Sequence, residues 1–88
     1  MPAGHLSSRH QKTLDRIYET PTLANVRWSE VVSLLVALGC EVVPTRGSMY
    51  LVSHRGGSRL VLHRPHPGSE CRRNLVERIR EYLEMLDG

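Results

Sequence analysis

The sequence contains no phenylalanine, and tryptophan and tyrosine together make up only 5% of its residues. A hydrophobic core must therefore be built mainly from aliphatic side chains, and few aromatic rings are left to stack on unpaired bases. The single tryptophan, Trp28, is expected to anchor the core, because a buried indole ring contributes a large apolar area.

Cysteines and long apolar runs are also scarce. Cys40 and Cys71 do not suffice for the disulfide framework of a small secreted domain, and Cys40 is expected to be a small buried side chain. No apolar run approaches the length of a membrane span, and the first residues lack the hydrophobic core of a signal peptide. We therefore expect a cytoplasmic protein with reduced thiols and no membrane partner.

The 88 residues suffice for one domain with a modest core, and a charged fraction of 24% is typical of globular chains. The net charge is +3, so the protein is basic. Between residues 46 and 73 a single acid, Glu70, stands against a cluster of basic side chains. The cluster comprises Arg46, Arg55, Arg59, Arg64, Arg72 and Arg73, with His54, His63 and His66. This asymmetry suits a polyanion or an acidic protein partner, and a merely solvated loop region is the alternative.

Three helices are predicted after a disordered segment at residues 1–7. Ser8 and Gln11 form a capping-box pattern, and Pro21 follows the end of a helix at about residues 9–19. Apolar residues recur with helical spacing from Trp28 to Gly39, and again from about Arg72 to the C-terminus. The charged face of the last helix is interpreted as a solvated surface made of Glu77, Arg78, Arg80, Glu81 and Glu84.

Between the second and third helices the apolar pattern changes to a period of two, which predicts strands at residues 41–46, 48–54 and 58–63. Pro44 cannot donate to a strand ladder, so it should lie at a sheet edge or near a bulge. The order α-α-β-β-β-α predicts an α+β fold, with a three-stranded antiparallel sheet and the last two helices packed on one of its faces.

Two stretches concentrate residues suited to chemistry. The first is the corner at residues 46–50, where Gly47 permits close approach of a ligand. Strand alternation places Met49 and Tyr50 on opposite sheet faces, with Tyr50 toward the core. The second is the run at residues 62–68, in which two prolines flank His66. Strand pairing should bring the end of the third strand close to the corner.

From Trp28 onward the sequence resembles the HicA family of toxin–antitoxin ribonuclease toxins. The resemblance rests on features in a fixed order, none of which is specific alone. They are the helix at 31–39 ending in Leu-Gly, Arg46-Gly47-Ser48, His54 before Arg55-Gly56-Gly57, and His66-Pro67-Gly68 before the last helix. The resemblance implies a double-stranded-RNA-binding-domain-like α-β-β-β-α sandwich at residues 26–88, to which residues 8–25 add an N-terminal helix and linker.

The resemblance also implies mRNA cleavage and neutralisation by a HicB-like antitoxin. In the family pattern a catalytic histidine directly follows Gly-Ser, whereas this chain has Met49 at that position. A thioether has no proton that titrates near neutral pH and cannot act as general acid or base. The resemblance therefore implies an endoribonuclease, an mRNA interferase, whose catalysis is altered or lost at Met49.

Metal-free RNA cleavage needs a base for the 2′-hydroxyl and an acid for the leaving oxygen, and His63 and His66 are the candidates for these roles. The alternative is that His63 closes a strand and His66 pins the proline-containing loop. A zinc site made by His63, His66 and Cys71 would lack a paired Cys-x-x-Cys half, so we expect no metal and no cofactor.

Residue types favour RNA binding over catalysis. Arginines hold phosphates, and double-stranded RNA is recognised largely by its shape, through phosphates and 2′-hydroxyls. The predicted RNA-binding residues are Arg46, Gly47, Ser48, Arg59, Arg64, His66, Arg72 and Arg73.

The competing interpretation is a non-catalytic protein-interaction module. Strand alternation predicts that Met49, Leu51 and Val61 project from the sheet face opposite Leu60 and Leu62. An apolar surface of this kind would be covered by an antitoxin or by a second copy of the chain.

Overall fold

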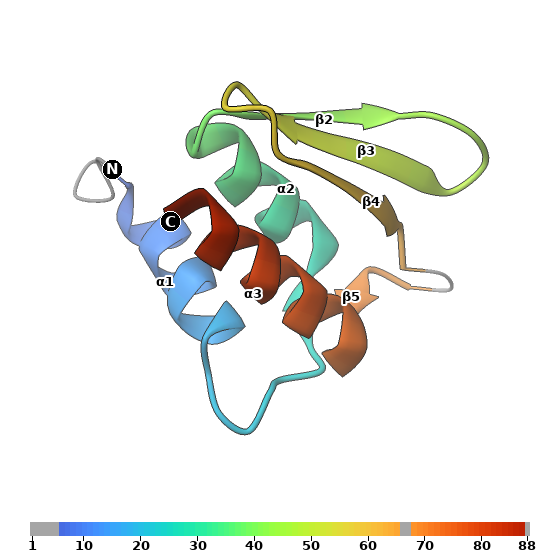
Figure 1. The fold of residues 1–88 in the computed structure, drawn as a ribbon. Helices are drawn as coiled ribbons and strands as arrows, with labels where there is room; N and C mark the ends of the chain where they lie inside the picture. Colours follow the sequence, from blue (N-terminus) through green and yellow to red (C-terminus); the bar gives the residue numbers. More distant parts are fainter. Residues whose placement is uncertain (1–5, 66–67, 88) are drawn as a thin grey trace.

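The computed structural model describes residues 6–65 and 68–87, and these form three helices and five strands (Figure 1). In chain order the elements are α1 (Ser8–Ile17), β1 (Val26–Arg27), α2 (Trp28–Ala37), β2 (Cys40–Pro44), β3 (Met49–His54), β4 (Arg59–His63), β5 (Glu70–Cys71) and α3 (Arg73–Asp87). The three predicted helices and the three predicted strands are all present, and most of their ends lie within two residues of the expected positions.

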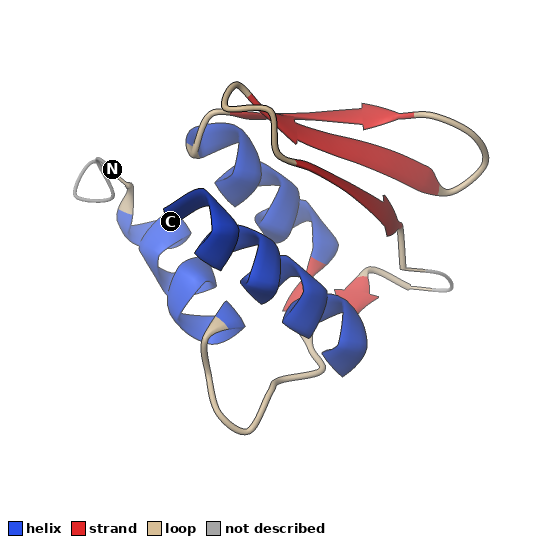
Figure 2. Cartoon of the chain, in the orientation of Figure 1, coloured by secondary structure: helices blue, strands red, loops and turns tan. Residues whose placement is uncertain are grey.

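The three longer strands form one antiparallel sheet in the order β2-β3-β4, which confirms the predicted meander. Pro44 lies in the edge strand β2, where a missing donor leaves no neighbour unpaired. Figure 2 shows α2 and α3 under one face of this sheet, and α1 packs against both helices on their far side. The fold is the expected double-stranded-RNA-binding-domain-like sandwich with an additional N-terminal helix.

The core lies between the sheet and the helices and is mainly aliphatic. Val52 and Leu62, from neighbouring strands, are fully buried in the same core cluster as Leu34 and Ile79 from the helices. Trp28 is 6% exposed, and its ring meets that of Tyr50 edge to face with the centroids 5.5 Å apart. These contacts confirm that Trp28 anchors the core, and they fix the start of α2 against β3.

Both cysteines are free and buried, as expected for Cys40. Burial raises the pKa of the Cys71 thiol to about 11, and it also raises the pKa of Cys40 above its ordinary value. Neither thiol is therefore placed to act as a nucleophile.

A second, two-stranded ladder was not predicted. Val26 of β1 pairs with Cys71 of β5, and Arg27 pairs with Glu70. The N–H of Trp28 extends the contact by donating to the carbonyl of Ser69 at 2.7 Å. Strands of two residues are too short to produce a period of two in the sequence, yet this ladder ties the start of α2 to the start of α3.

The capping-box prediction for α1 was wrong. Ser7 is the N-cap, and its Oγ accepts from the N–H of His10 at 3.2 Å. The side chain of Gln11 does not reach back to the cap and instead donates to Asp15 at 3.0 Å. Leu6 packs against the core, and the rest of the segment predicted to be disordered, residues 1–5, lies outside the described residues.

The prediction of a solvated charged face on α3 was wrong for Arg80, whereas the other four residues of that face are exposed as expected: Glu77, Arg78, Glu81 and Glu84. Arg80 is half-buried, and its guanidinium donates to the carbonyls of Ile17 and Glu19 and to Oγ1 of Thr22, at 2.9, 3.2 and 3.0 Å. Thr22 in turn donates to Glu77 at 3.2 Å. This face of α3 therefore holds the end of α1 and the linker that follows it.

No helix within the described ranges is both long and apolar enough to span a bilayer.

Candidate nucleic-acid interface

The corner between β2 and β3 is a tight turn closed by hydrogen bonds. The backbone N–H and Oγ1 of Thr45 both donate to the carbonyl of Met49, at 3.0 and 3.2 Å, and the N–H of Met49 donates to the carbonyl of Arg46 at 3.0 Å. Gly47 has φ +60°, a left-handed conformation that glycine adopts without steric cost. A β-carbon on Gly47 would meet no atom within 4 Å, so its backbone faces open space and can approach a ligand.

The end of β4 lies beside this corner. The N–H of Arg64 donates to the carbonyl of Ser48 at 2.8 Å, and His63 is the register partner of Met49. Because hydrogen-bonded and non-hydrogen-bonded pairs alternate along an antiparallel ladder, Met49 and His63 form a non-hydrogen-bonded pair, whose side chains stand close together. The predicted approach of the third strand to the corner is thus confirmed.

A groove of ≈ 280 Å³ runs between the corner and the loop after β4, and we call it the corner groove. It is lined by Gly47, Ser48, Tyr50, Arg64, Pro65 and Gly68. An open glycine backbone, a hydroxyl and a guanidinium are the groups that bind phosphate oxygens. Tyr50 forms the inner wall of the groove, where its contact with Trp28 holds the ring in place.

A second groove of ≈ 280 Å³ adjoins the first and reaches the first turns of α3, and we call it the α3 groove. Its lining residues are His63, Arg64, Pro65, Glu70, Arg72, Asn74, Leu75 and Arg78. Three guanidinium groups thus stand against one carboxylate, which gives the groove a positive potential. Arg64 and Pro65 line both grooves, so the two form one continuous basic surface.

The structure does not bring every predicted RNA-binding residue to this surface. Arg59 pairs with Ser53 at the other end of β4, far along the strand from the corner. Arg46 and Arg73 are exposed beside the grooves but do not line them, and His66 lies outside the described residues.

Arg78 is the residue that sequence reasoning missed. Its guanidinium donates to the carbonyl of Val61 at 3.1 Å, which fixes it against the middle of β4 while it lines the α3 groove. Arg78 lies four residues after Asn74 on α3, so the two share a helix face, and this spacing was the only available signal.

The described residues contain limited means for acid–base chemistry. His63 is exposed beside Met49, but no carboxylate is hydrogen-bonded to it among the side chains that the structure places. Cys71 is fully buried in β5 and faces neither groove, so it cannot join His63 in a metal site. Among the described side chains, no group of three or more His, Cys, Asp or Glu residues is arranged to hold a metal ion.

The sheet face turned away from the helices carries an apolar ladder. Val43 pairs with Leu51, and Leu51 pairs with Val61, so one residue from each strand lies in the same row. Val43 is 45% exposed and Val61 is 41% exposed, and Met49 is half-buried beside them. We call this surface the outer sheet face. The expected placement of Met49, Leu51 and Val61 opposite Leu60 and Leu62 agrees with this register.

The α-β-β-β-α sandwich with a glycine-cornered basic surface defines a small domain of the double-stranded-RNA-binding-domain type. Residues 28–85 match the family model described as the HicA toxin of bacterial toxin-antitoxin systems. The chain belongs to this family, which confirms the resemblance found in the sequence, and membership implies an antitoxin as its partner. Neither a curated protein nor a solved structure gives a significant match to the chain.

Proposed function

We propose that this toxin binds RNA along the corner groove and the adjoining α3 groove. The observation that carries the proposal is the position of Arg64, which lines both grooves next to Gly47 and Ser48. Arg72 and Arg78 extend the positive surface along α3 and would neutralise further phosphates. Tyr50 is engaged with Trp28, so contacts to phosphates and 2′-hydroxyls are favoured over base stacking.

A gel-shift titration at two salt concentrations tests this proposal. Binding should weaken as salt rises, because cations that neutralise phosphates release condensed counterions. Arg64→Gln should reduce the slope of log K against log salt by about 0.7–0.9, the contribution of one phosphate contact. Arg59→Gln is the matched control, since it removes the same charge from the far end of β4. The proposal would be wrong if the protein did not bind RNA, or if its affinity for RNA did not change with salt concentration.

The proposed activity is that of an mRNA endoribonuclease whose catalysis is altered or lost at position 49. Met49 offers no proton near neutral pH, so a retained activity must draw on another side chain. His63 is the candidate for this acid–base role, because it is the cross-strand neighbour of Met49 on the same sheet face. Arg64 and Arg72 would stabilise the charge of the phosphorane.

The activity proposal is tested by measuring in vitro cleavage of RNA by the wild type, Met49→His, His63→Ala and His66→Ala. Wild-type cleavage that disappears in His63→Ala would place the acid–base group on β4, and a loss in His66→Ala would place it in the following loop. If only Met49→His cleaves, catalysis has been lost from this chain by that one substitution. If none of the four proteins cleaves, the enzyme proposal is wrong.

The second candidate function is that of a non-catalytic interaction module. It is favoured by the outer sheet face, where Val43, Leu51 and Val61 expose an apolar row without a covering element in the described chain. We propose that the antitoxin covers this face, with a second copy of the chain as the competing occupant.

Val61→Glu distinguishes these occupants. The antitoxin for this test is the product of a gene sought beside that of the toxin. Val61→Glu should abolish the complex with this antitoxin, because the new carboxylate would be buried at the interface without a partner. Val36→Glu is the matched control, since Val36 is 55% exposed on α2, a helix that packs on the opposite face of the sheet. A change from dimer to monomer on size-exclusion chromatography of the chain alone would identify the second copy. An intact antitoxin complex in Val61→Glu would contradict the proposal.

A further inference from the structure

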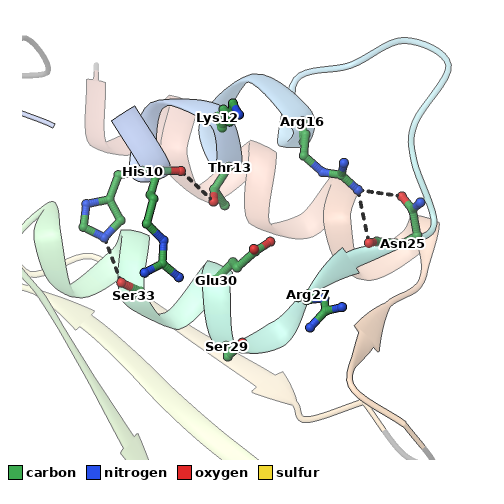
Figure 3. A pocket seen from close by; sticks show the side chains of 10 residues that line it. His10, Lys12, Thr13, Arg16, Asn25, Arg27, Ser29, Glu30 and Ser33 are labelled. Atoms are coloured by element: carbon green, nitrogen blue, oxygen red, sulfur yellow. Dashed lines mark hydrogen bonds between the residues drawn. The ribbon is translucent and has the colours of Figure 1, made fainter. Parts of the chain in front are cut away.

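A third cavity lies between α1 and the first turns of α2 (Figure 3). It measures ≈ 350 Å³, and we call it the α1–α2 cleft. Hydrogen bonds brace it at two points: His10 Nε2 is 2.7 Å from Ser33 Oγ, and Arg16 donates to the carbonyl and Oδ1 of Asn25 at 3.2 and 2.9 Å. The cleft is therefore a formed feature of the fold.

The lining of this cleft is strongly basic. Arg9, Lys12 and Arg16 come from α1 and Arg27 from the start of α2, whereas Glu30 is the single carboxylate. Among the described residues, none of these four cations forms an ion pair with a carboxylate. The Nε of Arg16 is buried and has no hydrogen-bond partner within the described part of the chain, while the terminal nitrogen of the same guanidinium binds Asn25.

The start of α2 adds to the positive potential. Arg27 occupies the N-cap position without making a side-chain cap bond. Ser29 and Glu30, in the first helical turn, line the cleft, and the amides of a first turn have no partner within their own helix. The partial positive charge of the helix N-terminus thus reinforces the four cationic side chains.

The spacing of the cations favours an extended anion over a single ion. Arg9, Lys12 and Arg16 follow one another at i, i+3 and i+7, so they lie on one face of α1 and span about 10 Å of its axis. One strand of a duplex carries a phosphate for about every 3.4 Å of helix axis, so a row of cations about 10 Å long can face more than one consecutive phosphate. The cleft also has room for on the order of ten water molecules, several times the size of one phosphate group.

We infer that the α1–α2 cleft is a second contact for the phosphate backbone of RNA, built largely from a helix outside the family match at residues 28–85. This inference rests on the proposed RNA binding of the grooves and extends it. The cleft and the α3 groove adjoin at the β1–β5 ladder, since Arg27 lines the cleft and its register partner Glu70 lines the groove. One bound RNA can therefore contact both.

The test measures RNA affinity by fluorescence anisotropy, with a short labelled single-stranded RNA over a series of NaCl concentrations. The cleft variant is Lys12→Gln/Arg27→Gln, which leaves the half-buried Arg16 in place. Its salt slope should fall by about 1.4, the value for two contacts to a single strand. Arg55→Gln/Arg59→Gln, at the β3–β4 hairpin, also removes two positive charges, so it is the charge-matched control and should leave the slope unchanged. Glu30→Gln should raise the affinity, because it removes the one anionic group that repels the ligand.

The outcomes separate the cleft from the grooves. Thermal denaturation first verifies that the cleft variant is folded. The cleft assignment is overturned if this variant binds RNA as the wild type does while the groove variant Arg64→Gln/Arg72→Gln loses binding. If the cleft variant alone loses binding, the cleft assignment stands and the groove proposal fails. Competition with adenosine monophosphate identifies the source of the phosphate: displacement at concentrations comparable to those of the RNA would show a free nucleotide as the ligand and overturn the assignment to a strand.

Discussion

Gly47→Ala should destabilise the domain by about 1 kcal/mol, because a β-carbon is strained at φ +60° even where the space around it is open. Gly47→Asn should cost less, since asparagine adopts the left-handed conformation more readily than alanine. Urea denaturation measures both changes. Gly56→Ala is the control, because Gly56 has no positive φ and its β-carbon would lie in ordinary contact with His54. Equal losses for the two alanine variants would contradict this account of the corner.

Single residues of the site were predictable where strand alternation fixes the direction of the side chain. A period of two predicted Met49 on the face opposite Tyr50, and the expected strand pairing brought the end of the third strand to the corner. Prediction from the sequence failed for Arg59, whose distance from the corner depends on the register, and for Arg78, whose role depends on how α3 docks against β4. Register and docking are set by packing of the whole core, which no local pattern contains.

At the scale of elements, Arg80→Ala should release the end of α1 from α3. It removes three hydrogen bonds from a charged donor to residues 17–22, so a loss of about 2–3 kcal/mol in the free energy of unfolding is expected. Hydrogen exchange should show α1 losing protection before the sheet does. Glu84→Ala, on the exposed side of the same helix, is the control and should change stability by less than about 0.5 kcal/mol. A cooperative loss of protection throughout the chain would argue against a local role for Arg80.

Elements with several periodic residues were predicted correctly from the sequence, and their ends were predicted only to within about two residues. The helix from Trp28 and the final helix carry long apolar stripes, so their existence follows from periodicity. The N-cap of α1 moved from Ser8 to Ser7 because adjacent serines offer equivalent caps, and only the geometry of the first turn selects one. The β1–β5 ladder exists because tertiary packing brings two short segments together, and it left no sequence signal.

For the molecule as a whole, stability should fall at alkaline pH. Both thiols are protonated at neutral pH, and above a pH of about 8.5 the unfolded chain loses protons from its cysteines. The folded state keeps the proton of Cys71 until pH about 11, and that of Tyr82 until about 12. The unfolded state then binds fewer protons, so each buried thiol lowers the free energy of unfolding by up to about 1.4 kcal/mol per pH unit in this range.

Cys71→Ala isolates one part of that effect. The variant should lose stability at neutral pH, because a buried sulfur is removed, but its stability should decline less steeply between roughly pH 8.5 and 11. Denaturation at a series of pH values under reducing conditions measures the slope. A decline as steep as that of the wild type would show that this thiol is not responsible.

The α+β fold class could be predicted from the sequence, whereas the cleft between α1 and α2 could not. The order of elements and their apolar faces allow few arrangements other than two helices on a three-stranded sheet. The position of α1 depends on specific bonds, among them those of His10 to Ser33 and of Arg80 to the end of α1. The cleft that α1 forms with α2 could therefore be recognised only in three dimensions.

The edge-to-face contact between Trp28 and Tyr50 makes the protein its own optical reporter. Trp28 is the only tryptophan in the chain, and its ring touches the residue that forms the inner wall of the corner groove. Anything that enters the groove and displaces Tyr50 changes the surroundings of a single indole, and loss of the core exposes that same indole to water. Occupancy and unfolding can thus be followed through its emission in the unlabelled, unmodified chain.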